Sequence, residues 1–153
     1  MSEFDTRTKQ YTGRRWTYQY DARGTAIGEF VLFTPSRGIV IERDGTQGNL
    51  AGFKRLFEVE LGPPGPLAKT DLVDLIAIPD PAGISTSGGL PCDVGLGDPF
   101  AFPFVTIESV LVMGPDLLAV VNDNNYPFSI GRHVGAAAPD DMEFILIRLP
   151  ERL

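Results

Sequence analysis

A cluster of oxygen-bearing side chains follows an apolar segment in the stretch LLAVVNDNNYPFS. Residues 117–121 are all apolar, and the four residues after them are Asn122, Asp123, Asn124 and Asn125. Carboxylate and amide oxygens are hard ligands, which suit Ca²⁺ and, less well, Mg²⁺. Runs of Asp and Asn also end strands and form Asx-turns. The stretch therefore predicts either a metal-binding or substrate-binding cluster at a strand end, or a turn.

Two predicted hairpins would bring further carboxylates to such strand ends. If each hairpin turns midway between its strands, Glu29 faces Asp44 and Glu108 faces Asp123. Directly opposed residues share one face of a sheet, with Cβ atoms about 5 Å apart. Like charges this close repel each other unless a cation, an arginine or a proton lies between them. We expect these four carboxylates to bind Ca²⁺, and a register slip of one residue would undo the pairing.

Cationic side chains lie close to the same strand ends. The motif ERDGTQG holds Glu42, Arg43 and Asp44, and Lys54 follows in the next apolar segment. Arginine suits bidentate recognition of phosphate or carboxylate, whereas lysine makes point-charge contacts. These cations could therefore bind an anionic substrate. The alternative for Arg43 is a neutralising pair with a carboxylate.

A polar segment, GRHVGAAAPDDMEF, precedes the last apolar run and holds Arg132, His133, Asp140, Asp141 and Glu143. We expect His133 to lie at the surface rather than to act as a general base. The alternative for the whole segment is a solvated loop. The sequence has no GxSxG elbow, no Walker A motif and no dinucleotide-binding GxGxxG, so neither a nucleophilic serine nor a nucleotide site is indicated.

Short apolar segments separated by turn residues dominate the chain, as expected for an all-β protein. Segments that read as strands lie at 27–33, 38–44, 53–61, 105–113, 117–121 and 142–149. Residues 69–78 fit either a strand or a helical turn, and residues 79–103 are loop-like. The runs VLVM and FILI predict strands that are covered on both faces.

The chain contains an internal repeat. IGEFVLFTPSRGIVIERDG and TIESVLVMGPDLLAVVNDN align without gaps, which places Glu108 on Glu29. We predict that residues 1–153 form one segment with blade-like units at about 27–61 and 105–149, a leading strand and a loop-rich insertion at 79–103. Repeated sheet units are typical of β-propellers, which need at least four blades to close. We therefore expect part of a larger propeller, completed by missing N-terminal blades or by self-association.

The composition limits the classes of partner. The formal net charge of −7 argues against nucleic acid and anionic membranes. No apolar run is long enough to span a bilayer, and the N-terminal MSEFDTRTKQ lacks the apolar core of a signal peptide. His133 is the single histidine, which excludes a multi-histidine zinc site, and Cys92, the single cysteine, reads as a loop thiol.

Six motifs taken together resemble a known family. ERDGTQG, FKRLFEVEL, DLVDLIAIPDP, FPFVTIESVLV, VVNDNNYPFSIGR and DDMEFILIRL occur in this order and resemble the phytase-like β-propeller family labelled as having the esterase-like activity of phytase. The resemblance implies a propeller and a hydrolase of phosphoric or related esters, usually with calcium. Members are typically longer and exported, so the chain resembles their C-terminal portion. Its own localisation stays open, although the resemblance suggests periplasmic or secreted full-length relatives.

The resemblance, combined with residue chemistry, implies a role for each candidate. The expected catalytic residues are Glu42, Asp44 and Glu108. The expected metal ligands are Glu29, Asp44, Glu108 and Asp123. The expected substrate-binding residues are Arg43, Lys54, Asn122, Asn124 and Arg132. Ca²⁺ would polarise a phosphoryl oxygen of a small anionic ester and activate the attacking water, since no nucleophilic side chain is evident.

Two other functions stay open at this point. The chain could be a non-catalytic propeller fragment that binds a ligand or a partner, or a calcium-dependent lactonase or carboxylester hydrolase. Turnover of a phosphoester would favour the first hypothesis. Binding without turnover would favour the fragment, and selective hydrolysis of lactones or carboxylic esters would favour the third. We expect the isolated chain to be poorly active because its terminal strands leave open edges.

Overall fold

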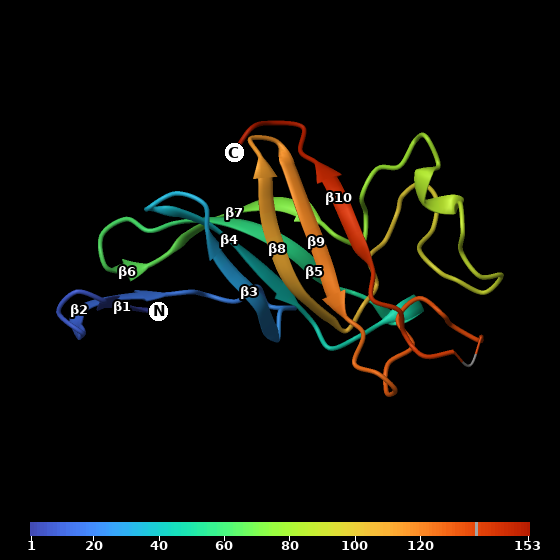
Figure 1. Cartoon of the computed structure of the whole chain (residues 1–153), viewed down its shortest axis with the longest axis horizontal. Coiled ribbons are helices and arrows are strands. Elements are labelled where there is room, and N and C mark those ends of the chain that lie inside the picture. Colours follow the sequence, from blue (N-terminus) through green and yellow to red (C-terminus); the bar gives the residue numbers. More distant parts are fainter. Residues whose placement is uncertain (137) are drawn as a thin grey trace.

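The chain folds into strands and loops in the computed structural model, which describes residues 1–136 and 138–153 (Figure 1). The strands are β1 (Ser2–Asp5), β2 (Gln10–Thr17), β3 (Ala26–Leu32), β4 (Arg37–Arg43), β5 (Lys54–Glu60), β6 (Gly65–Pro66), β7 (Ala68–Asp74), β8 (Thr106–Gly114), β9 (Leu117–Asp123) and β10 (Phe144–Arg148). Two short 3-10 helices, η1 (Gly48–Leu50) and η2 (Ile84–Thr86), lie in loops. The all-β prediction is confirmed, and residues 69–78 supply most of β7.

The strands form three small sheets. β3, β4, β5 and β7 make a four-stranded antiparallel sheet in that order, and β8, β9 and β10 make a three-stranded antiparallel sheet with β9 in the middle. The third sheet has the order β1, β2, β6, and its β2–β6 pair is parallel. The two antiparallel sheets resemble propeller blades, although the described residues form no closed propeller.

The first blade-like sheet is buried on both faces at its central strand, β4. Successive strand residues point to opposite faces, so Ile39 and Ile41 face the second sheet while Val40 faces away from it. All three are at most 1% exposed.

Trp16 of β2, in the third sheet, is also buried, and its indole Nε1 donates a hydrogen bond to the Gly62 carbonyl over 3.1 Å.

The two blade-like sheets pack face to face, with β8 against β3 and β4 (Figure 1). This approach requires a glycine in β3, because a Cβ at Gly28 would lie 2.0 Å from the carbonyl oxygen of Ile107. The main core lies between these sheets and is completed by side chains from the loop before β8. Its buried members are Ile39, Ile41, Leu56, Leu75, Phe100, Phe102, Phe104, Ile107, Val110, Leu118, Val120, Ile147 and Leu149.

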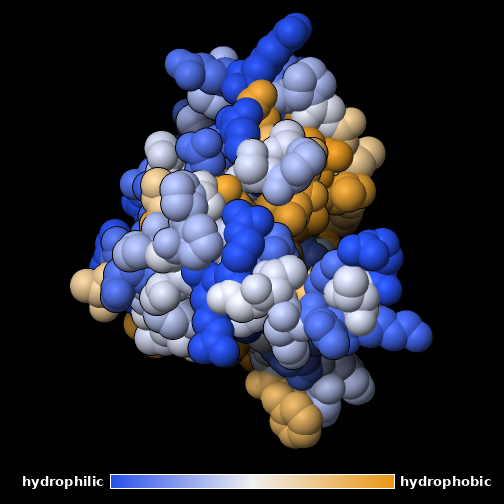
Figure 2. All heavy atoms as spheres, turned by 90° about the vertical axis from the view of Figure 1, so that its left-hand side faces the viewer, coloured by the Kyte–Doolittle hydropathy of each residue, from blue (hydrophilic) through white to orange (hydrophobic). Residues whose placement is uncertain are grey.

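The outer face of the second sheet is exposed and apolar. Leu111 and Met113 of β8 are 57% and 54% exposed, and Phe144 and Leu146 of β10 are 63% and 57% exposed. Figure 2 shows hydrophobic residues gathering on the right of its view, the side that faces the reader in Figure 1. The prediction that VLVM and FILI are covered on both faces is therefore wrong for the described residues. We refer to these four residues as the outer face.

The predicted pairing of acidic residues across the hairpins is also wrong. Thr106, rather than Glu108, faces Asp123, because the register shifts between β8 and β9 at the position of Glu108. The β3–β4 register shifts in the same way around Glu29, and Asp44 lies beyond the last paired residue of β4. A bulge places two residues of one strand against one of its partner. The second hairpin turns at residues 115 and 116 as predicted, since Gly114 pairs with Leu117, and register shifts farther along β8 change its later partners. The first hairpin turns earlier than predicted, since Leu32 pairs with Gly38.

Candidate functional site

In the predicted strand-end cluster, cationic and acidic side chains form ion pairs and so neutralise each other. Lys54 is fully buried, and its ammonium donates to the Asp44 carboxylate over 2.5 Å, the Asp44 carbonyl over 2.9 Å and the Thr46 carbonyl over 2.8 Å. These bonds use all three lysine protons. Burial lowers the pKa of Lys54, and Asp44 only partly offsets this effect. Burial alone would raise the pKa of Asp44, but the bonds from Lys54 and Thr46 lower it below its ordinary value.

Arg43 links the two blade-like sheets. Its guanidinium donates to the Glu108 carboxylate over 2.7 Å, and its side chain is only 12% exposed. This contact matches the neutralising pair that stood as the alternative for Arg43. Glu108 therefore neutralises the charge of Arg43, whose Nε is buried without a hydrogen-bond partner among the described residues.

Glu42 is buried and binds the segment that follows β2, so it does not line a cleft. It is fully buried and accepts hydrogen bonds from the Tyr18 hydroxyl over 2.5 Å, the Asp21 amide over 2.6 Å and the Lys69 ammonium over 2.8 Å. Each bond ties Glu42 to a segment outside β4. Burial, reinforced by the hydrogen bond to Glu42, raises the pKa of Tyr18 well above its ordinary range. The network explains the buried carboxylate without a catalytic role.

The NDNN run forms local turns. Asp123 accepts a hydrogen bond from the Asn125 amide over 3.2 Å, and Asn124 accepts one from the Tyr126 amide over 3.3 Å. Asn122 is buried and holds the chain before β10, since it accepts from the Glu143 amide over 2.7 Å and donates to the Asp141 carbonyl over 2.9 Å. These contacts match the Asx-turn alternative for this stretch.

The four expected metal ligands do not meet. Glu29 accepts a hydrogen bond from the Val110 amide over 2.5 Å, Asp44 binds Lys54 and Glu108 binds Arg43. Within residues 1–136 and 138–153, no group of three or more His, Cys, Asp or Glu side chains is placed to hold a metal ion. The four expected ligands therefore do not form one site in this arrangement, and we derive no reaction step through calcium.

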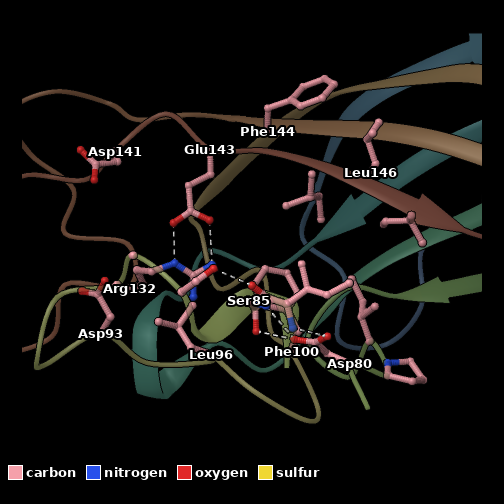
Figure 3. Close-up of a pocket in the computed structure, with 18 of the residues that line it drawn as sticks. Asp80, Ser85, Asp93, Leu96, Phe100, Arg132, Asp141, Glu143, Phe144 and Leu146 are labelled. Carbon is pink, nitrogen blue, oxygen red and sulfur yellow. Dashed lines mark hydrogen bonds and ion pairs between the residues drawn. The ribbon is translucent and has the colours of Figure 1, made fainter. Parts of the chain in front are cut away.

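A groove lies instead between the loop-rich insertion and β10. It has a volume of about 700 Å³. Its apolar wall includes Ile78, Leu96, Phe100, Ile145 and Ile147. Its polar end includes Asp93, Arg132, Asp141 and Glu143 (Figure 3). His133 also lines this end. The groove brings together segments that lie far apart in the sequence.

Arg132 is a structural cation at the polar end of the groove. Its side chain forms a fork with the Glu143 carboxylate, in which Nη2 donates over 2.8 Å and Nε also donates (Figure 3). The guanidinium further donates to the carbonyls of Val94 over 2.6 Å and Ala101 over 3.3 Å. Because these bonds occupy the guanidinium, Arg132 orders the insertion against the last strand and is not free to bind a substrate anion.

His133 lies between two carboxylates, and the expectation that it is a surface residue is wrong. It is 4% exposed. Nδ1 lies 2.6 Å from Asp93, whose side chain is 3% exposed, and Nε2 lies 3.0 Å from Asp141, whose side chain is 73% exposed. Burial alone would lower the pKa of His133, but hydrogen bonds and charges from both aspartates raise it above its ordinary value.

Sequence reasoning did not pair His133 with Asp93. The two residues are separated by forty positions and by β8 and β9, and no spacing motif connects them. Asp141 and Glu143 were visible as acidic residues, but only the folded chain shows that they flank His133 and Arg132. The one available signal was the isolated DDMEF before the last strand.

Comparison with protein-family models matches residues 1–126 to the phytase-like family described as "Esterase-like activity of phytase". The match covers most of the chain. The chain belongs to this phytase-like family. No curated protein and no solved structure matches it. No helix among the described residues is long and apolar enough to cross a membrane.

The family match includes some parts of the candidate site and leaves out others. The strand-end ion pairs and Asp93 lie within the matched residues of this phytase-like chain, whereas Arg132, His133, Asp141 and Glu143 lie beyond them. Membership supports an esterase-type or phosphatase-type hydrolase at the coarse level. The polar end of the groove has to be interpreted from its own geometry.

Proposed function

We propose that this phytase-like chain hydrolyses an uncharged ester in the groove, with His133 as the general base. One observation carries the proposal: a buried histidine, fixed by a buried aspartate on one nitrogen, presents its other nitrogen at the polar end of a groove of about 700 Å³. The family description supports the reaction class.

The tautomer of His133 follows from its neighbours. The Asp93 carboxylate accepts a hydrogen bond from Nδ1, so the neutral imidazole carries its hydrogen on Nδ1 and its lone pair on Nε2. That lone pair faces a carboxylate oxygen of Asp141, and two acceptors repel each other. Because Asp141 is exposed, its side chain can turn toward solvent and water can take its place at Nε2.

The reaction then needs one water molecule and forms no covalent bond between the enzyme and the substrate. The water oxygen bonds to the ester carbonyl carbon while one of its protons passes to Nε2. The tetrahedral intermediate collapses, the bond to the alcohol oxygen breaks, and the alcohol leaves with the proton from Nε2. Ser85 does not compete as a nucleophile, since its hydroxyl donates to Asp80 over 2.7 Å and accepts from the Gly97 amide over 2.8 Å.

The charges around the groove favour an uncharged substrate. Its lining contains four carboxylates, those of Asp80, Asp93, Asp141 and Glu143. Arg132, its one arginine among the described lining residues, is bound to Glu143 and to carbonyl groups. A phosphoester anion would meet net negative charge there, whereas a carboxylic ester or lactone with an apolar acyl chain would suit the apolar wall.

The phosphoester reaction expected from the resemblance is the second candidate, and the family description supports it. Its expected cations, Arg43 and Lys54, are bound to carboxylates. Calcium binding stays a prediction. Melting curves of the chain and of Asp123→Ala in calcium or EDTA test it, because a calcium-dependent rise that the variant lacks would support a site at Asp123, and a flat response would contradict one.

The proposal is tested with the 4-nitrophenyl esters of acetate, butyrate and phosphate and a lactone. We expect turnover of the carboxylic esters or the lactone. We expect a fall in kcat on the order of 100-fold or more in His133→Gln, as for loss of a general base. Asp116→Asn, remote on the β8–β9 turn, is the matched control, and melting curves check that each variant folds. Ligand binding without turnover would favour the non-catalytic alternative.

A further inference from the structure

The outer edge of β10 is open. β10 pairs with β9 on one side, and no described strand pairs with its other side. The backbone groups that point outward can be identified from the neighbouring bonds. The Asn122 amide donates to the Glu143 carbonyl over 3.4 Å, and the Leu149 amide donates to the Asp116 carbonyl over 2.8 Å. Since inward and outward positions alternate in an antiparallel pair, the amides and carbonyls of Phe144 and Leu146 point outward.

The first blade-like sheet shows what a covered edge looks like. β5 and β10 are corresponding strands, because β5 follows β3 and β4 in the first sheet as β10 follows β8 and β9 in the second. β5 has a second partner, β7, which pairs along nearly its whole length. β10 lacks such a partner, so the second sheet is one strand short of the first.

The open edge faces the groove. Phe144, Ile145, Leu146 and Ile147 all line it, which means that the groove runs along the strand rather than across its end. The opposite wall includes Ile78 and, from the insertion, Ile84 and Leu96. The strand itself carries none of the usual protections of an edge over its first four residues, FILI, which include no charge and no proline.

One carboxylate of the groove is more exposed than the others. Asp141 lies just before β10, and its side chain is 73% exposed although it contacts His133 over 3.0 Å. The carboxylates of Asp93 and Glu143 bind His133 and Arg132, and that of Asp80 binds Ser85. A strand with alternating apolar residues and a cation at the end nearest Asp141 would therefore complement the groove.

We propose that the groove binds an extended peptide segment, which pairs with β10 as the fourth strand of the second sheet and places a lysine or arginine near Asp141. Backbone hydrogen bonds provide sequence-tolerant affinity in this mode, while the apolar wall and Asp141 select the side chains. The site lies in the groove of the proposed hydrolase, but strand binding does not depend on hydrolysis and is measured without it.

Peptide titration followed by backbone NMR tests the proposal on the full chain. The probes are capped hexapeptides that alternate valine and threonine, with lysine at one end, at the other end or absent. We expect shifts concentrated at Phe144 and Leu146, slower amide exchange at both residues, and the tightest binding for one of the two lysine peptides. Absence of such shifts at about 1 mM peptide, where even weak pairing is detectable, would overturn the proposal.

N-methylated peptides separate strand pairing from general apolar binding. Methylation of the amides that face β10 should abolish binding, whereas methylation of the alternate amides should leave it within about twofold, because only the first set donates to the edge. Equal binding of the two methylated peptides would contradict a fourth strand.

Two variants of Leu146 make the same distinction in the protein. Leu146→Pro removes an amide hydrogen that points away from β9, so the β9–β10 pairing can persist while peptide binding is lost. Leu146→Ala keeps the amide and should retain most of the binding. Peptide binding by a chain that hydrolyses no ester would leave this inference standing and overturn the proposed function, and ester turnover without peptide binding would do the reverse.

Discussion

At the scale of single residues, the contact between His133 and Asp141 makes ester hydrolysis depend on pH. The imidazolium can donate to both flanking aspartates, so low pH holds Asp141 over Nε2 and occupies the base. We expect kcat/KM for an uncharged ester to rise with pH, with a midpoint above the ordinary histidine value because the pKa of His133 is raised. In Asp141→Asn one raising charge is lost, so the midpoint of the pH–rate profile should move to lower pH. A midpoint that stays in place would contradict Asp141 as a neighbour of the base.

Asp140 provides a residue-scale test of stability. It is 4% exposed, its Oδ1 has no partner among the described residues, and burial raises its pKa to about 6. Between its unfolded pKa of about 4 and this value, the folded chain binds more protons, so stability falls as pH rises through that window. The expected loss is on the order of 2–3 kcal/mol. Asp140→Asn should flatten this slope in urea unfolding at about pH 4.5 and pH 7.

Asp71, whose side chain is 65% exposed, offers a matched control for the removal of one carboxylate. Asp71→Asn breaks only an exposed ion pair with Arg55, which is expected to contribute less than about 1 kcal/mol. An unchanged slope in Asp140→Asn would show that Asp140 does not govern the pH dependence.

Residue chemistry predicted which side chains are polar anchors but not which partners they have. Arg43 and Asp44 stand together in ERDGTQG and Lys54 follows in FKRLFEVEL, and a neutralising pair with a carboxylate was one of the two predicted outcomes for Arg43. The contact between Asp93 and His133 depends on the path of two loops around β8 and β9, which periodicity does not encode. The sequence could therefore suggest a site at the strand ends more readily than the groove.

At the scale of elements, the hairpins were predictable and their registers were not. Alternating apolar residues and turn signals fix a hairpin, but a bulge depends on how the strand packs against another sheet. Glu29 shows this dependence, since its carboxylate leaves the hairpin and accepts the Val110 amide of β8. The same packing determines why Gly28, next to it, must be a glycine.

Gly28→Ala tests the contact between the two blade-like sheets. The added Cβ would lie 2.0 Å from the Ile107 carbonyl oxygen. Neither atom can avoid the clash by a side-chain rotation, because the position of each is fixed by the backbone. We expect a loss of stability of at least about 2 kcal/mol in urea unfolding. Gly45→Ala is the control, because a Cβ there has nothing within 4 Å. Equal stability of the two variants would contradict the close approach of β3 and β8.

At the scale of the whole molecule, the outer face is an apolar surface that no described element covers. Leu111 and Met113 of β8 and Phe144 and Leu146 of β10 are each more than half exposed. An exposed apolar surface of this kind drives association in water.

We expect the chain to self-associate through the outer face. Sedimentation velocity should show a mass that rises with concentration, and Leu111→Asp should keep the chain monomeric because a carboxylate cannot be buried there without a partner. Leu50→Asp is the matched control, since Leu50 is 78% exposed on η1 and lies outside the outer face. A monomeric wild-type chain, or association that persists in Leu111→Asp, would show that this face is not the contact. Because Leu111 lies on β8, Leu111→Asp leaves the backbone edge of β10 in place, and the monomeric variant shows whether that edge still binds a peptide when the outer face, which shares Phe144 and Leu146 with the groove, is no longer packed.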